Sequence, residues 1–84
     1  MSYEILFTDT SRNQFKKLEK EAQERIIKGL ERIRIRPEVF VKKLVADPGY
    51  RLRIGEYRVI VDIIQEKLII LVIKIGHRKN IYKN

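Results

Sequence analysis

The side chains that could do chemistry gather near the end of the printed sequence. In the stretch VIKIGHRKNIYKN (72–84), an apolar run stops at Gly76, and His77, Arg78 and Tyr82 follow within a few positions of one another. His77 is the only histidine. Arginine is always charged and offers paired donors to phosphate oxygens, and tyrosine can stack on an unpaired base. These residue types predict contacts with phosphates and bases; the competing interpretation is a solvated basic tail.

A predicted hairpin earlier in the chain brings two more arginines together. The stretch YRLRIGEYRVIVDII (50–64) alternates apolar and polar residues around a Gly-Glu pair that suits a two-residue turn. That turn places Arg53 opposite Arg58, with both side chains on the same face of the sheet. Opposed like charges destabilise a sheet unless an anion lies between them. The pair therefore suits an anion-binding site, although the side chains could instead splay into water or pair with Glu56 or Asp62.

The next predicted strand, LIILVIKI, decides which basic residues join this pair. A two-residue loop within 65–67 would place Arg58 opposite Ile75, whereas a three-residue loop would place it opposite Lys74 and bring Lys74 to the same face. In both registers Arg78 lies close to the arginine pair. Arginines from three consecutive strands would then meet at one end of one face, which is an arrangement suited to binding phosphate.

The elements that must position these residues are predicted from hydrophobic periodicity. YEILF (3–7) is a short strand, and the cluster of capping residues after it marks a helix start. Apolar residues then recur at helical spacing, at Phe15, Leu18, Ala22, Ile26, Leu30 and Ile33. The pattern fits either one long helix or a helical hairpin broken near 19–21. Pro37 is expected to end it, and residues 38–49 form a connection that closes on the turn DPG (47–49).

These elements predict an α+β fold in a single domain, residues 1–84. A first strand and one or two helices precede a three-stranded antiparallel meander, and the helices cover one face of the sheet. There is no internal repeat, linker or low-complexity segment.

The charge balance indicates a polyanionic partner. The sequence has 19 Lys and Arg against 11 Asp and Glu, a net charge of +8, which fits nucleic acid or an acidic protein segment. A solubilising surface in a heat-adapted organism is the alternative. The absence of cysteine excludes disulfides and thiolate metal sites. With no signal peptide at the start and no apolar run of membrane-spanning length, we expect a soluble, cytoplasmic protein.

The hairpin YRLRIGEYRVIVDI and the ending LVIKIGHRKNIYK together resemble the RelE/ParE superfamily of small toxins, and its RelE branch in particular. The resemblance implies a helical hairpin packed on a twisted antiparallel sheet of about four strands. It also implies a ribosome-dependent messenger-RNA endonuclease that needs no metal or cofactor. Such toxins enter the A site of the 30S subunit, use the ribose 2′-hydroxyl to attack the adjacent phosphate, and are held inactive by a RelB-like antitoxin.

The resemblance also assigns roles to individual residues. Arg53 and Arg58 would bind the scissile phosphate, Arg78 would lie near the leaving group, and Tyr82 would stack on or orient a base. Arg51 would contact backbone phosphates. The full expected set is therefore catalytic Arg53, Arg58, Arg78 and Tyr82, with RNA contacts from Arg51, Lys74 and His77. Strand alternation aims His77 at the opposite face from Arg78.

The sequence departs from relatives that carry lysine at the positions of Arg51 and Arg53. A lysine is proposed there as general base, and arginine is a very poor base at neutral pH. Either Tyr82 or His77 takes the proton, or positioning on the ribosome and arginine electrostatics suffice, which leaves room for a weakened activity. The alternatives in function are a ParE-type inhibitor of DNA gyrase and a non-catalytic basic RNA- or ribosome-binding module. The complete set of arginines with Tyr82 favours cleavage.

Overall fold

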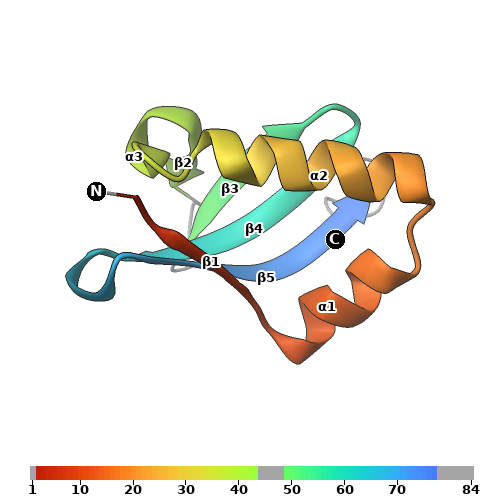
Figure 1. Ribbon diagram of the computed structural model, residues 1–84, viewed down its shortest axis with the longest axis horizontal. Helices are drawn as coiled ribbons and strands as arrows, with labels where there is room; N and C mark the ends of the chain where they lie inside the picture. The colour runs from red at the N-terminus through yellow and green to blue at the C-terminus, as the bar shows by residue number, and fades with distance from the viewer. Residues whose placement is uncertain (1, 44–48, 78–84) are drawn as a thin grey trace.

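A computed structural model describes residues 2–43 and 49–77, which fold as a twisted sheet with helices packed against it (Figure 1). The strands run in the order β1-β5-β4-β3-β2; β1 is parallel to β5, and every other neighbouring pair is antiparallel. A short 3₁₀ turn, η1 (Gln65–Lys67), joins the two longest strands. The elements are β1 (Glu4–Phe7), α1 (Asp9–Lys16), α2 (Lys20–Arg32), α3 (Pro37–Phe40), β2 (Lys42–Lys43), β3 (Tyr50–Ile54), β4 (Tyr57–Ile64) and β5 (Ile69–His77).

The predicted α+β class, first strand and three-stranded meander are confirmed, whereas the predicted sheet is incomplete. The sheet has five strands rather than about four, because the two-residue β2 pairs with β3 inside the predicted connection 38–49. It is also mixed rather than antiparallel, because the first strand, β1, pairs in parallel with the last strand, β5. Most of the predicted turn at 47–49 lies outside the described residues.

The helical segment is a hairpin of α1 and α2, which confirms the second of the two alternatives that periodicity left open and excludes one long helix. Thr8 caps α1, its side chain accepting a hydrogen bond from the Ser11 backbone N–H at 3.1 Å. The break falls between Lys16 and Lys20, slightly before the predicted position. Pro37 does not end this segment: α2 already stops at Arg32, and Pro37 opens α3, at a helix start where its missing N–H costs nothing.

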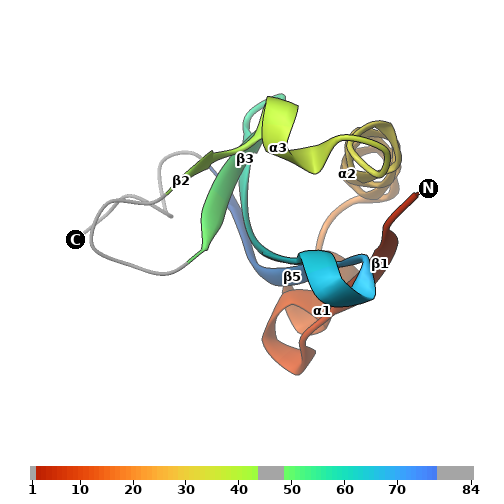
Figure 2. The ribbon, with the colours of Figure 1, turned by 90° about the vertical axis from the view of Figure 1, so that its left-hand side faces the viewer.

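Helix α2 lies across one face of the sheet, as Figures 1 and 2 show, and the hydrophobic core is formed by residues of both. The helix supplies the apolar positions predicted from periodicity, and the strands supply alternate residues of the meander. The buried core residues are Tyr3, Ile26, Leu30, Ile33, Leu52, Val59, Val61, Ile70, Val72 and Ile75. Helix α1 contacts β5 and β1 instead. None of the helices in the described ranges is long and apolar enough to cross a membrane.

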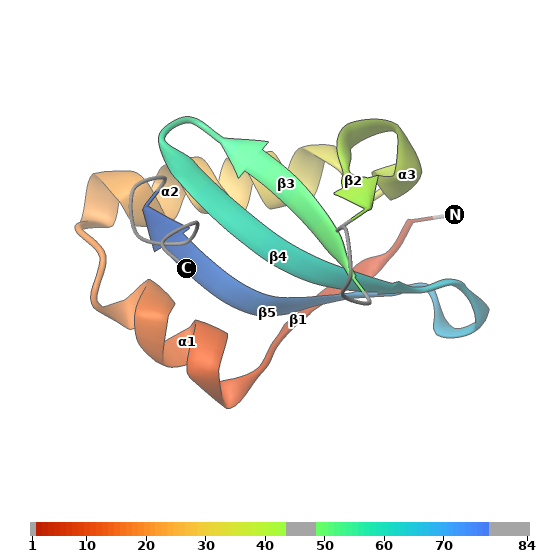
Figure 3. The same ribbon diagram turned by 180° about the vertical axis from the view of Figure 1, so that it is seen from behind.

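The opposite face of the meander carries no described helix, and in Figure 3 the strands β3, β4 and β5 are seen from this side. We call it the open face. Side chains on it belong to the strand positions that alternate with the core residues.

A β-bulge interrupts the pairing of β4 with β5. Val61 lies opposite Val72, but its neighbour Ile60 lies opposite Lys74, so Ile73 is an extra residue in β5. A bulge bends the strand and shifts the register of everything beyond it by one residue. The bulge therefore sets which β5 residues face the arginines of β4.

Side chains of α1 hold β5 in this bulged conformation. The buried Ser11 hydroxyl donates a hydrogen bond to the Val72 carbonyl at 2.7 Å. The Gln14 side-chain Oε1 accepts a hydrogen bond from the Ile75 backbone N–H at 2.7 Å. Because β1 pairs with β5 only as far as Val72, α1 takes over as the hydrogen-bonding partner of this edge.

We expect Gln14→Ala to lower the free energy of unfolding by about 1–3 kcal/mol, because it removes the acceptor of the partly buried Ile75 N–H. Gln14→Glu keeps an acceptor at the same place and is expected to cost less. Asn13→Ala, on an exposed neighbour in the same helix, is the matched control. Urea unfolding of the four proteins measures the difference. Equal stabilities for Gln14→Ala and Asn13→Ala would contradict the role given to Gln14.

Candidate nucleic-acid interface

The two arginines of the hairpin lie opposite each other, as the sequence predicts. Gly55 has a positive φ of 58°, which suits the tight turn. From this turn, Ile54 pairs with Tyr57 and Arg53 pairs with Arg58. The Arg53 side chain is exposed, whereas Arg58, in the middle of the sheet, is only 8% exposed.

The predicted register of the third strand is wrong in both of its forms. Arg58 lies opposite Gly76, not opposite Ile75 or Lys74. The bulge at Ile73 causes the difference, since it adds one residue to β5 between the turn and this pair. As a result Ile75 stays in the core opposite Val59, and the arginine faces a residue without a side chain.

Two further cations lie on the open face beside this pair. Arg51 and Lys74 are both partners of Ile60, which is two residues from Arg58 and therefore on the same face. Lys74 is exposed. The sequence analysis placed Lys74 on the same face as Arg58 only if the loop within 65–67 had three residues. The structure also places it on this face, but opposite Ile60 rather than opposite Arg58. We call Arg51, Arg53, Arg58 and Lys74 the basic face.

Two acidic residues of the described strands share this side of the sheet. Glu4 lies on the far edge strand β1, opposite Ile69, and is exposed. Asp62 follows Ile60 by two positions and is half-buried. Asp62 and Glu4 both lie further from the Arg53–Arg58 pair than Ile60 does, toward the η1 turn. The end of the face near the Gly55 turn is therefore its most basic part.

His77 lies on the other side of the sheet. It pairs with Tyr57, and because its neighbour Gly76 faces Arg58, its side chain points away from the basic face. Its ring meets the Tyr57 ring edge-on at a centroid distance of 5.7 Å, and Nε2 lies 3.2 Å from Glu56 Oε1. This contact ties the end of β5 to the β3–β4 turn. The orientation agrees with the alternation expected from the sequence.

The remaining two candidates, Arg78 and Tyr82, lie outside the described residues, and their roles stay predictions. Arg78 directly follows His77 in the sequence.

The basic face is chemically suited to a phosphodiester backbone. Its side chains project from three adjacent strands whose pairing fixes their spacing. Guanidinium groups hold their charge at any physiological pH and bind phosphate oxygens through paired donors. Donors fixed in this way can also stabilise charge that develops on a phosphate during reaction.

The fold, with helices packed against a twisted sheet, matches solved structures of the small RelE toxins. The chain belongs to the ParE toxin family of type II toxin–antitoxin systems, parDE, which it matches over residues 5–82. It is thus a toxin of this type, and the superfamily recognised in the sequence is confirmed.

Solved structures of toxin–antitoxin complexes share the fold. The intact RelBE complex of E. coli matches with a TM-score of 0.78 and 26% identity, over 90% of this chain and 96% of the other. The RelBE2 complex of Mycobacterium tuberculosis matches with a TM-score of 0.86 and 22% identity, over 93% and 100% of the two chains. The RelE–RelB complex of Pyrococcus horikoshii matches with a TM-score of 0.75 and 23% identity, over 95% and 99%. No curated protein sequence matches this one.

The sequence analysis missed a second basic surface, on α2. Arg25, Lys28 and Arg32 line a groove between this helix and β3. Arg25 and Arg32 lie about two helical turns apart and therefore on one side of α2, and this signal was present in the sequence. What the sequence did not reveal is the apolar groove beside them, which forms only when the helix packs on the strand.

Proposed function

We propose that this toxin cleaves messenger RNA in the A site of the ribosome, with the basic face against the RNA backbone. The observation that carries the proposal is the pairing of Arg53 with Arg58 on the open face, with Arg51 and Lys74 beside them. Four cations on three neighbouring strands give this end of the face a dense positive charge. A phosphodiester backbone offers that charge anionic oxygens that guanidinium groups bind through paired donors.

The reaction needs three things from the toxin and the ribosome. The 2′-hydroxyl loses a proton as its oxygen bonds to the adjacent phosphorus, the phosphorane carries extra negative charge, and the 5′-oxygen takes a proton as its bond to phosphorus breaks. The products are a 2′,3′-cyclic phosphate and a 5′-hydroxyl. Arg53 and Arg58 would bind the phosphate and stabilise the phosphorane. Arg78 would lie near the leaving oxygen, and Tyr82 would stack on a base.

The position of His77 makes it the weaker of the two candidate residues for the general base. Its contacts with Glu56 and Tyr57 hold it on the face opposite to Arg58. This placement favours Tyr82, or positioning combined with arginine electrostatics, over a direct role of His77 in proton transfer.

We also propose a RelB-like antitoxin as the partner that keeps the toxin inactive. The E. coli relative, at 26% identity, is a toxin in complex with its antitoxin. The net charge of +8 fits a partner with acidic segments, as well as the ribosome and its RNA. This proposal places the toxin in the cytoplasm.

Inhibition of DNA gyrase is a second candidate function, because the family that the chain matches is described by its ParE toxins. Controlled expression of the toxin in cells tests the two against each other. We expect growth arrest with messages cut inside their coding regions and DNA intact. Damaged DNA with full-length messages would contradict RNA cleavage and support the gyrase candidate.

Ribosome binding is expected to weaken steeply with added salt, because contacts with phosphates release counterions. Lys74→Ala and Arg53→Ala should each make the dependence of log affinity on log salt less steep, by about 1 unit of slope. Lys16→Ala, which removes a charge at an exposed position of α1, is the control and should leave the slope unchanged. Binding to purified ribosomes across a salt series measures the slopes. A slope that responds to Lys16 as strongly as to Lys74 would contradict a contact through the basic face.

A further inference from the structure

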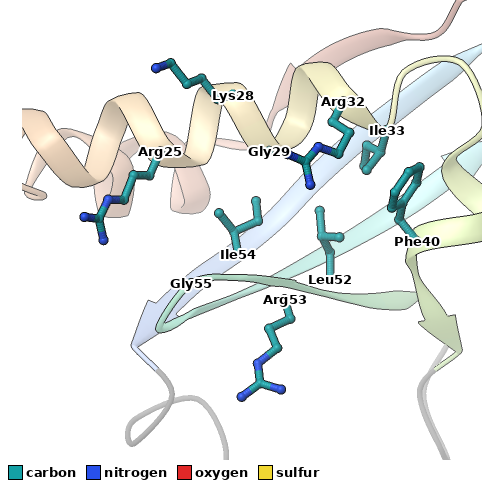
Figure 4. Close-up of a pocket in the computed structure, with 10 residues that line it drawn as sticks. All are labelled: Arg25, Lys28, Gly29, Arg32, Ile33, Phe40, Leu52, Arg53, Ile54 and Gly55. Atoms are coloured by element: carbon teal, nitrogen blue, oxygen red, sulfur yellow. The ribbon is translucent and has the colours of Figure 1, made fainter.

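A groove of about 310 Å³ lies between α2 and β3, on the side of β3 opposite to the basic face. Figure 4 shows the division: the Leu52 and Ile54 side chains point toward α2, whereas Arg53 between them points away. The strand therefore carries two different surfaces. One surface faces the proposed RNA site, and the other is the floor of this groove.

The floor of the groove is apolar. It is formed by Leu52 and Ile54 of β3, by Ile33 just after α2, and by Phe40 of α3. Phe40 is 43% exposed, and Val39 beside it is 63% exposed. The apolar surface thus continues from the groove onto α3. Side chains of this kind gain stability when a partner removes them from water.

The rim of the groove is basic. Arg25 and Arg32 point from α2 toward the groove, whereas the Lys28 side chain, although its residue also lines the groove, points to the other side of the helix (Figure 4). Arg25 makes an ion pair with Glu21 at 3.5 Å, and both side chains are largely exposed, so this pair is weak and easily exchanged for another carboxylate. The rim would attract negative charge on a ligand that lies in the groove.

Close packing fixes the depth of the groove. Gly29 lies between the rim residues, and a Cβ atom added there would come within 2.7 Å of Ile54 Cδ1. Only glycine lets the helix approach the strand this closely without displacing that side chain. The groove is therefore a formed feature of the fold.

The edge of β3 next to the groove is also available. Strand β2 pairs with β3 only at Tyr50 and Arg51. Among the described residues, no strand pairs with the Leu52–Ile54 part of that edge. An incoming segment would therefore reach the groove without displacing a described strand.

We propose that this groove binds an acidic amphipathic segment of a partner protein, with its apolar side chains on the floor and its carboxylates on the rim. An apolar floor beside Arg25 and Arg32 matches a segment that carries both apolar and acidic residues. A nucleic acid would use the rim but not the floor. A second copy of this chain, at +8, would bring mostly positive charge to a positive rim.

The inference rests on the proposed antitoxin partner and names a surface for it, separate from the basic face. A partner seated here leaves Arg53 uncovered unless its chain continues around the edge of β3. Variants of the groove should therefore change partner binding without changing RNA cleavage, which separates the two proposals.

The test uses designed peptides of about 15 residues, near the length at which helices become stable, and the isotope-labelled full-length toxin. The first peptide has leucines at helical spacing flanked by glutamates. The second carries lysine in place of each glutamate, and the third carries serine in place of each leucine. We expect the first peptide to shift the amide NMR signals of Gly29, Phe40, Ile54 and Gly55, and to bind at least about tenfold more tightly than the other two.

Charge-reversal variants complete the test. Arg25→Glu together with Arg32→Glu should weaken binding of the first peptide by about tenfold or more. Arg12→Glu together with Lys16→Glu, at two exposed positions of α1, changes the net charge by the same amount and should leave most of the peptide binding intact. The proposal would be overturned if both double variants lost binding equally, or if the first peptide did not bind. It would also be overturned if the peptide-induced shifts were centred on Arg53. A single-stranded RNA of about ten nucleotides that shifts the groove signals would overturn it as well, since that result assigns the groove to nucleic acid.

Discussion

Arg53→Ala is expected to slow ribosome-dependent RNA cleavage by about 100-fold or more, a loss of about 3 kcal/mol of transition-state stabilisation. The side chain lies opposite Arg58 on the open face and is exposed. Its removal therefore leaves the hydrophobic core untouched, and the free energy of unfolding should change little. Losing a fixed donor aimed at the phosphorane accounts for the expected size of the effect.

Two control variants separate this effect from a general loss of charge. Arg12→Ala removes the same charge at an exposed position of α1 and should leave the cleavage rate within a few-fold of wild type. Arg53→Lys keeps the charge but loses the paired donors, and we expect an intermediate rate. The measurement is single-turnover cleavage on ribosomes loaded with one message. A rate for Arg53→Ala equal to that of Arg12→Ala would remove Arg53 from the site.

Ile26→Ala is expected to lower the free energy of unfolding by about 2–5 kcal/mol, the usual cost of a cavity in a packed core. Ile26 is fully buried where α2 packs on the sheet. The adjacent Ile27 is 41% exposed on the same helix. Ile27→Ala removes the same atoms and should cost far less, so the two variants compare burial at constant chemistry.

Denaturant unfolding of both variants measures this difference. Because marginally stable domains have only about 5–15 kcal/mol to lose, Ile26→Ala should also reduce toxicity in cells by lowering the amount of folded protein. Similar losses in the two variants would contradict the position of α2 on the sheet.

The hairpin of β3 and β4 could be predicted residue by residue because a two-residue turn fixes its register locally. The Gly-Glu turn alone determines that Arg53 faces Arg58. The pairing of β5 could not be predicted in the same way. Its bulge at Ile73 is held by Ser11 and Gln14, about 60 residues earlier in the chain, and no local pattern in the strand reveals such contacts.

The same limit explains the other differences in the fold. Hydrophobic periodicity predicted the buried side of the helical segment, including Ile26 and Leu30. The same periodicity continues across the break between α1 and α2, so it could not decide between one helix and two. The parallel pairing of β1 with β5 joins distant parts of the chain. Strand β2 has only two residues, too few for a pattern.

For the candidate site, strand alternation placed Arg51 beside Arg53 and aimed His77 at the other face, and the structure has both arrangements. The basic character of α2 was visible as well. The groove that gives this helix a proposed partner depends on the fit of Gly29 against Ile54, which is a tertiary feature.

The central claim is most directly tested by mapping RNA cut sites on ribosomes stalled with a defined codon in the A site, with purified wild-type toxin beside Arg78→Ala. The account predicts cuts within that codon for the wild type, leaving a 2′,3′-cyclic phosphate on the upstream fragment. For Arg78→Ala it predicts cuts at the same positions, at a rate reduced by about 100-fold or more, a loss of ~3 kcal/mol of transition-state stabilisation. Intact message with the wild type, or cuts that appear equally without ribosomes, would contradict it.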